Sequence, residues 1–408
     1  MHPSAGGPGP VTHGQLLDLL RRQGPTTRRD LLKATQLSRS TLVERIATLQ
    51  GLGLLREGPR RPAGNGRPPV ALEFDVSSHT TLGIDLGAAH ATIAVTDLAA
   101  QLVRTQRLRA DLSSDPMKLL RRLIRSASRL LDKPGGGREV LLGVGLSFPG
   151  LVGREAGTIE APAVLEHWDG VPAGRIIGKA FGVPALLVND AHAMAYGEHL
   201  VDGRSRTLLA VKVATGIGAG LVMDGRLHRG DSNGAGQFGH MRVPALTDRC
   251  TCGARGCLAT IASGRALLEK LRRHGVDSLE EIVWASEQGH RATRGALREA
   301  GEAVGVVLSG FATMIDPGAV LIGGTVGALE PFQEGVRSSI DELTYARTRR
   351  GIYVGPTLLG EEGAVTGLAA LIVDRELSPD AVDALVAANV AAAAPAVRLV
   401  SAASQTRS

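Results

Sequence analysis

Apolar residues recur with two different periods along the chain, and the change of period divides it into two parts. Between residues 11 and 50 leucines recur at helical spacing, interrupted by Gly24-Pro25 and by a polar turn, which predicts three short helices. Two brief strands follow at 54–56 and 70–74, separated by a loop rich in Arg, Gly and Pro. Three helices followed by two strands are typical of a winged helix-turn-helix, which we place at 11–76.

The third predicted helix, at 39–50, has one apolar face and one polar face. Leu42, Ile46 and Leu49 share the apolar face, which we expect to pack on the first two helices. The polar face and the loop between the strands would face DNA. The residues that we expect to contact it are Ser38, Arg39, Ser40, Thr41, Glu44 and Arg45 at and around the helix, and Arg60, Arg61 and Arg67 in the wing.

The charge of the chain supports this interpretation. The net charge is +6 with a pI near 9.6, and residues 1–75 hold eleven Lys and Arg against six Asp and Glu. The basic character therefore belongs to one end, as expected of a unit that binds the phosphate backbone of double-stranded DNA. A three-helix domain that binds another protein is the alternative.

Beyond residue 77, short apolar strands alternate with helices up to residue 376. Each half of this region opens with consecutive strands, which predicts an α/β fold of two lobes with a cleft between them. Lobe 1 is expected at 77–188 with 364–376, and lobe 2 at 189–363. The Gly- and Pro-rich residues 1–10 are expected to be disordered, and the Ala- and Val-rich tail at 377–408 receives no function. No signal peptide and no apolar run of membrane-spanning length occurs, so a cytoplasmic protein without a membrane partner is expected.

All three cysteines of the chain lie within eight residues, at Cys250, Cys252 and Cys257, and His240 precedes them by ten. Three thiolates and one imidazole form a complete tetrahedral ligand set for zinc. Four protein ligands leave no open position, so the predicted zinc is structural rather than catalytic. The alternative is three buried free thiols and a surface histidine.

This stretch, GHM followed by CxCGxxGC, resembles the signature of the ROK family of sugar kinases and sugar-responsive repressors. The resemblance implies an actin-like ATPase fold over about residues 80–376, and it implies that His240 contacts both zinc and a sugar. The N-terminal segment resembles the winged helix of ROK repressors, which the kinases of the family lack.

Within the resemblance, several kinase motifs are present and others are altered. Asp190 matches the catalytic general base, and with Asn189, Gln237 and His240 it would line an effector site. The residues that match nucleotide loops are Asp85 and Gly87 in the first, Thr215, Gly216 and Gly218 in the second, and Gly323 and Gly324 in the third. The first loop has Ala88 and Ala89 where kinases have Gly and Thr, so its backbone fits phosphate poorly. Gln237 and Ala259 stand where the family has sugar-binding glutamates.

These observations predict a DNA-binding regulator of the ROK type, a repressor of carbohydrate-related genes, with a degenerate and non-catalytic kinase domain. It would act as a homodimer or homotetramer and respond to a sugar or a sugar phosphate. Two alternatives remain open: an active ATP-dependent sugar kinase with a DNA-binding arm, and a regulator controlled by a partner protein or by a metabolite other than a sugar.

Overall fold

The computed structural model describes residues 11–60, 70–133, 140–153, 157–161, 163–244 and 246–393. The chain divides into two compact units, one formed by Met1–Ser78 with Asp374–Ser408 and the other by His79–Val373. The expectations for residues 1–10 and for Arg61 and Arg67 lie outside the described residues.

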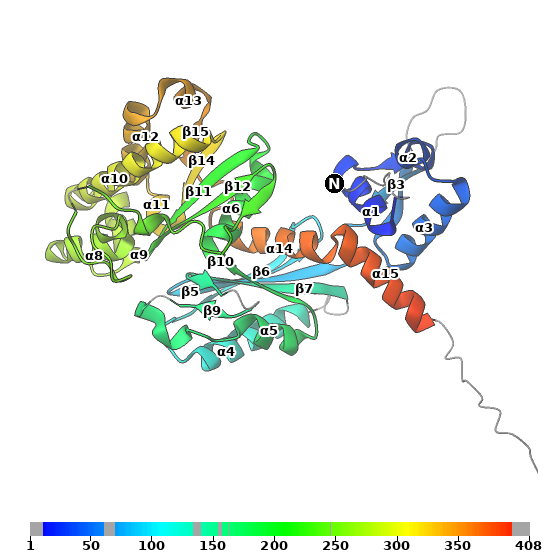
Figure 1. The fold of residues 1–408 in the computed structure, drawn as a ribbon. Helices are drawn as coiled ribbons and strands as arrows, with labels where there is room; N and C mark the ends of the chain where they lie inside the picture. Colours follow the sequence, from blue (N-terminus) through cyan, green and yellow to red (C-terminus); the bar gives the residue numbers. More distant parts are fainter. Residues whose placement is uncertain are drawn as a thin grey trace, which may run out of the picture. The chain divides into compact units, whose positions relative to one another are not determined.

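The N-terminal unit contains the expected winged helix. Its helices are α1 (His13–Gln23), α2 (Arg28–Thr35) and α3 (Arg39–Gly51), and its strands are β1 (Thr26–Thr27), β2 (Leu55–Arg60) and β3 (Val70–Phe74) (Figure 1). The strands pair in the order β1-β3-β2, and both pairings are antiparallel. Side-chain oxygens of Thr12, Thr27 and Ser38 accept hydrogen bonds at the starts of the three helices, which fixes where each helix begins.

The last helix of the chain completes this unit, in contrast to the sequence-based view of 377–408 as a tail of its own. Helix α15 (Pro379–Ala393) packs on α1, where the backbone N–H of Gly14 donates to Asp383 at 2.8 Å. Arg21 of α1 forms an ion pair of 2.8 Å with Asp374. The residues of this end that bury apolar surface are Leu377, Val382 and Val386. Helix α15 consists almost entirely of small apolar residues, so no alternation of apolar and polar positions marks its buried face in the sequence.

The second unit consists of two lobes, each built on a five-stranded sheet of the same topology. The lobe 1 sheet has the order β10-β7-β4-β5-β6, and the lobe 2 sheet has the order β13-β12-β11-β14-β15. In both, three antiparallel neighbours, consecutive in the chain, continue into two parallel ones. The repeated order confirms the predicted actin-like fold.

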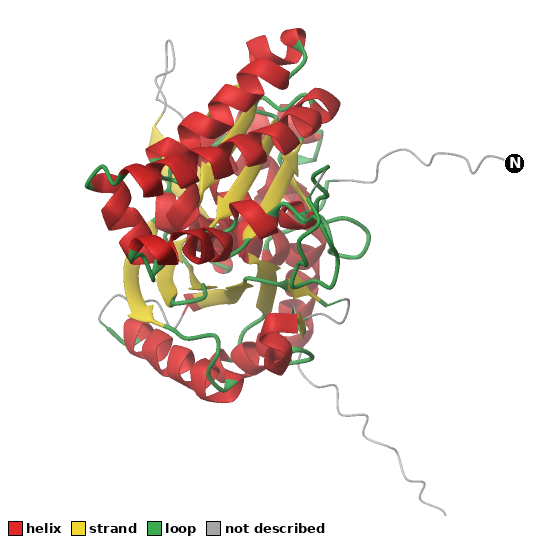
Figure 2. Cartoon of the chain, turned by 90° about the vertical axis from the view of Figure 1, so that its left-hand side faces the viewer, coloured by secondary structure: helices red, strands yellow, loops and turns green. Residues whose placement is uncertain are grey.

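The strands of lobe 1 are β4 (Thr80–Leu86), β5 (His90–Asp97), β6 (Leu102–Arg109), β7 (Leu141–Phe148) and β10 (Ala185–Asn189), with a small ribbon of β8 (Leu151–Val152) and β9 (Ile159–Glu160). Those of lobe 2 are β11 (Thr207–Val213), β12 (Ile217–Met223), β13 (Arg226–His228), β14 (Ala319–Gly323) and β15 (Tyr353–Pro356). Figure 2, in which strands are yellow, shows helices packed against both sheets.

The helices of lobe 1 are α4 (Pro116–Leu131) and α5 (Ala173–Phe181). Those of lobe 2 are α7 (Ala259–Ala262), α8 (Gly264–Leu271), α9 (Leu279–Glu287), α10 (Arg291–Ile315), α11 (Gly324–Gly327), α12 (Glu330–Leu343) and α13 (Ala346–Gly351). Two further helices, α6 (Asp190–Asp202) and α14 (Gly363–Glu376), share one core with strands of both sheets. None of the helices in the described part of the chain is long and apolar enough to cross a membrane.

Replacement of Gly14 by Ala should weaken the docking of α15. A Cβ atom at this position would lie 2.0 Å from the carbonyl oxygen of Pro379, so α1 and α15 must move apart. We expect a loss of about 1–3 kcal/mol in the free energy of unfolding of the N-terminal unit, measured by urea denaturation. Gly51→Ala is the matched control, because a Cβ at this helical glycine meets open space. Equal stability of the two variants would contradict the close packing of the two helices.

Candidate functional site

The four predicted metal ligands lie together in lobe 2. Their ligand atoms are all within 4.8 Å of one another. The sulfurs of Cys252 and Cys257 are 3.7 Å apart, and the Cys250 sulfur lies 3.5 Å from Nδ1 of His240. A tetrahedral zinc with ordinary bond lengths requires about 3.8 Å between two sulfurs and about 3.5 Å between sulfur and nitrogen. Burial lowers the pKa of His240, which favours the neutral ring that binds a metal. The four side chains therefore fit a metal ion.

Close backbone contacts fix the histidine in this arrangement. His240 ends a single 3-10 turn, η3 (Phe238–His240). The ring of Phe238 is buried, and its centroid lies 5.8 Å from that of the tilted Phe311 ring. Gly236 has a φ of +82°, and a Cβ there would lie 2.0 Å from the carbonyl oxygen of Ala219 on β12. Glycine is thus required for the segment to lie against the sheet.

The predicted effector residues Asn189 and Asp190 lie where β10 ends and α6 begins. The Asn189 side chain caps the helix, accepting from the backbone N–H groups of Ala191 and His192, and donates to the carbonyl of Gly150 at 3.0 Å. Asn189 therefore already has partners for both ends of its amide. The Asp190 side chain is 13% exposed, and its Oδ1 accepts from the N–H of Ala191 at 2.9 Å.

A lysine that the sequence did not single out lies beside Asp190. Lys212 of β11 forms an ion pair of 2.8 Å with Asp190 and lies 3.9 Å from Asp85, which is near the end of β4. Ser147 of β7 donates to Asp85. Burial lowers the pKa of Lys212, but the carboxylates of Asp190 and Asp85 raise it by more, so its pKa lies well above the ordinary value. Burial raises the pKa of Asp85, and the ammonium opposes this rise. No spacing rule links position 212 to the two acids, so sequence reasoning had no signal for it.

The predicted nucleotide loops differ in how freely a ligand can approach them. A Cβ at Gly216 would meet nothing, so this turn between β11 and β12 is open. Gly218 instead faces Ala191, and Gly324, with a φ of +85°, lies against the carbonyl of Val213. Gly323 packs on Thr357, and Gly87 closes the hairpin between β4 and β5 by donating to His90. Several of these glycines therefore have a packing role whether or not a nucleotide binds. Thr215 accepts from the N–H of Arg265 through its carbonyl.

The segment that carries Gln237 contacts the helix that carries Asp190. His192 of α6 donates through Nε2 to the carbonyl of Ala235 at 3.0 Å. A very small pocket of about 20 Å³ is lined there by Val152, Leu187, Val188, Asn189, His192, Arg229 and Asn233. Gln237 is half-buried in this segment. The segment that carries Gln237 and His240 is thus joined by a hydrogen bond to α6, the helix that begins at Asp190.

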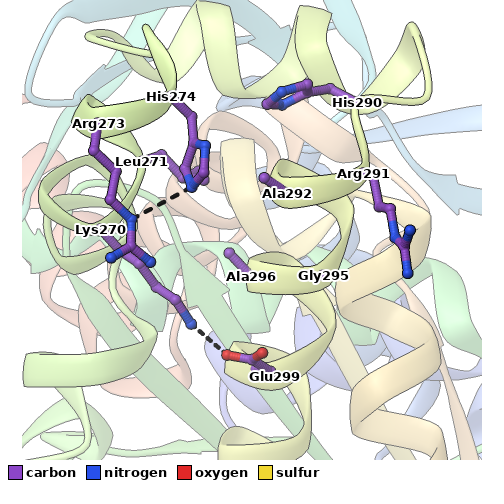
Figure 3. A pocket seen from close by; sticks show the side chains of 10 residues that line it. All are labelled: Lys270, Leu271, Arg273, His274, His290, Arg291, Ala292, Gly295, Ala296 and Glu299. Carbon is purple, nitrogen blue, oxygen red and sulfur yellow. Dashed lines mark hydrogen bonds and ion pairs between the residues drawn. The ribbon is translucent and has the colours of Figure 1, made fainter.

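A second and larger pocket lies on lobe 2, away from all the residues predicted from the sequence. It is formed by α8, α10 and the turn before α9, and its lining is strongly basic (Figure 3). Lys270 pairs with Glu299, and Arg273 contacts His274 (Figure 3). Neither the acids Asp85 and Asp190 nor the four predicted metal ligands line this pocket.

On α3 of the N-terminal unit, the predicted DNA-reading residues share an exposed surface. Arg39, Ser40 and Glu44 are exposed, and Ser38 joins Ser40 and Thr41 by hydroxyl hydrogen bonds of 2.9 and 2.8 Å. The Glu44 carboxylate lies 4.0 Å from the ring of His13.

Two features of α3 depart from the sequence-based picture. Val43, which was not singled out, is 59% exposed, and an apolar side chain on such a surface suits contact with a thymine methyl group. Val43 was not predicted from the sequence as a surface residue, because an apolar residue in a helix is normally assigned to the core. Arg45 is half-buried, and its Nη1 atom is buried without a hydrogen-bond partner among the described residues. Arg60 ends β2 at the base of the wing.

A winged helix joined to a two-lobed, sugar-kinase-like unit with a Cys₃His cluster defines a narrow class of protein. A profile described as the ROK family matches residues 81–375, so the chain belongs to the ROK family. A xylose repressor of Caldicellulosiruptor bescii is 28% identical over 370 residues, covering 86% of this chain and 92% of the repressor. The DNA-binding transcriptional repressor Mlc of Escherichia coli is 26% identical, covering 88% and 92% respectively.

Among solved structures, the crystal structure of a ROK family transcriptional regulator, a homolog of E. coli Mlc, superposes with a TM-score of 0.75. It covers 93% of this chain and 98% of that one at 23% identity, which establishes the shared fold. The relatives span the winged helix as well as the ROK domain, and the prediction of a ROK-type transcriptional regulator is confirmed.

Proposed function

We propose that this regulator represses carbohydrate-related genes by binding a double-stranded operator through residues 11–76, and that a sugar or sugar phosphate in the ROK cleft controls it. The observation that carries the proposal is the exposed polar face of α3 in a chain that also holds the cleft of Asp190. Two of its relatives are named xylose repressor and transcriptional repressor Mlc, which supports a sugar-linked role. Action in the cytoplasm as a homodimer or homotetramer is part of the proposal.

In this proposal the start of α3 reads base edges in the major groove. Arg39 and Ser40 follow the N-cap, where helix-turn-helix proteins contact bases, and Val43 lies one turn further on. Glu44 and Thr41 flank them, whereas half-buried Arg45 would orient α3 rather than read bases. Arg60, Arg61 and Arg67 would hold the phosphate backbone or the minor groove.

We further propose that zinc is the ion of the Cys₃His cluster and that it is structural. All four positions of a tetrahedral zinc would be filled by the protein, which leaves none for a substrate. Through the contact of His192 with Ala235, an ordered metal loop would hold Gln237 and His240 at the cleft. Arg229 lines the adjoining pocket and would suit a ligand that carries an anionic group.

The kinase alternative deserves a test because Asp190 is retained in the cleft. Against catalysis stand Ala88 and Ala89 in the first phosphate loop and the ion pair that Asp190 makes with Lys212. A general base must be able to take the proton of the sugar hydroxyl, and a carboxylate held by an ammonium is a poor acceptor.

Arg39→Ala should reduce sequence selectivity, whereas Arg61→Ala should weaken binding to all DNA alike. With an operator selected from a random duplex pool, we expect Arg39→Ala to cost about 1–3 kcal/mol for the operator and little for unrelated DNA. Arg61→Ala should lower the salt dependence by about one phosphate contact. Arg298→Ala is the control, because this side chain lies on the exposed side of α10 in the other unit. Equal losses of selectivity in the first two variants would refute this division of roles.

Protein purified without added zinc should contain one zinc per chain by mass spectrometry. Cys252→Ser should lose most of it and unfold at a lower temperature, because metal binding is coupled to folding. Thr251→Ser, a conservative change in the same loop, should keep both properties. A wild-type chain free of zinc would disprove the assignment.

Sugar phosphorylation should be absent. A coupled assay of nucleotide consumption over a panel of hexoses, pentoses and amino sugars should give turnover far below the ordinary enzyme value of about 10 per second. Turnover of about 1 per second or more with any sugar would establish the kinase alternative instead.

A further inference from the structure

The sheet of lobe 2 places the Lys212 side chain beside two carboxylates. It lies on β11, the central strand of lobe 2, where its in-register partners are Gly218 on β12 and Gly323 on β14. Directly paired residues project from the same face of a sheet. Both partners are glycines, and the space at these glycines is taken by Ala191 next to Gly218 and by Thr357 next to Gly323.

The ammonium group meets carboxylates that come from two different parts of the fold. Asp85 lies near the end of a strand of lobe 1, and Asp190 begins α6, which packs on the sheet of lobe 2. All three side chains are largely buried, with 13–17% of each exposed. A buried ion pair costs desolvation free energy that only close partners repay, so a lysine here requires the two acids and the acids require a cation.

Two carboxylates converging in a phosphotransferase-type cleft are the ligands that a divalent cation such as Mg²⁺ prefers, and phosphoryl transfer uses such a cation to neutralise phosphate charge. In this chain a side chain supplies that positive charge. We propose that Lys212 is a built-in counter-cation that stands in the place of a divalent metal ion, so that this cleft takes its ligand without a metal–nucleotide complex.

The proposal accounts for two observations together. It explains why both acids remain although the first phosphate loop has lost its glycine and threonine. It also explains why Asp190 makes an ion pair through Oδ2 while Oδ1 accepts from the backbone. That the cleft takes a sugar rests on the proposed function, whereas the occupation of the cation position does not.

The test removes the lysine and asks whether a divalent ion replaces it. Zinc-loaded full-length protein with Lys212→Gln is titrated with Mn²⁺ and followed by electron paramagnetic resonance of the free ion. We expect one additional Mn²⁺ per chain with a Kd below about 1 mM, and a melting temperature that rises with Mn²⁺, since ligands that bind only the folded state stabilise it. Wild-type protein should bind no Mn²⁺ in this range.

The matched control is Lys212→Gln combined with Asp190→Asn, which should abolish the gained binding. Wild-type protein that binds Mn²⁺ as tightly as Lys212→Gln would overturn the proposal, and so would a Lys212→Gln variant that folds but gains no site. Neither DNA nor sugar is present in the assay, so failure of the proposed function cannot be mistaken for failure of this inference.

Should Lys212→Gln fail to fold even with Mn²⁺, a variant in which Asp85→Asn and Asp190→Asn accompany it decides the question. Without the two carboxylates no positive charge is needed at this position, so this triple variant should fold with or without Mn²⁺. If it also fails to fold, Lys212 serves the fold in another way, and the proposal is wrong.

Discussion

The second unit depends on one close crossing of helices, where α6 and α14 approach backbone to backbone (Figure 1). A Cβ at Gly197 would lie 2.0 Å from the carbonyl of Gly363, and one at Gly367 would lie 1.8 Å from that of Ala193. The two helices share a core with β10, β11 and β14, so the strands of both lobes pack against this pair. Because α6 begins at Asp190, the same crossing positions the carboxylate around which the cleft is arranged.

Residues 235–240, which include the metal-ligand candidate His240, are held by direct contacts to β12 and to the start of α6. The Gly236 and Gly239 segment presses on β12, and its Ala235 carbonyl is held by His192, two residues from Asp190. A metal ion held by His240 and the three cysteines would therefore fix a segment that contacts α6.

Local patterns in the sequence predicted the helices and strands well. They could not predict contacts between segments that are far apart in the sequence. The third helix could be placed because Leu42, Ile46 and Leu49 keep a helical period, and the Cys₃His cluster because its ligands are close in sequence. Lys212 could not be predicted, since its partners are 22 and 127 positions away and only the fold unites them. Val43 was not singled out although it is exposed, and the half-burial of Arg45 could not be predicted from residue type alone. The docking of α15 depends on Gly14, a contact across 369 positions.

The pairing of the first and last segments of the chain has a consequence for synthesis on the ribosome. Domains tend to fold as units while the chain emerges, the N-terminal ones first. Here the winged helix emerges first, but α15, which covers α1, emerges last. A nascent or prematurely terminated polypeptide that lacks α15 therefore exposes the α1 surface on which α15 packs. The N-terminal unit is therefore completed only after the whole ROK domain has been synthesised, so its correct folding depends on translation through α15.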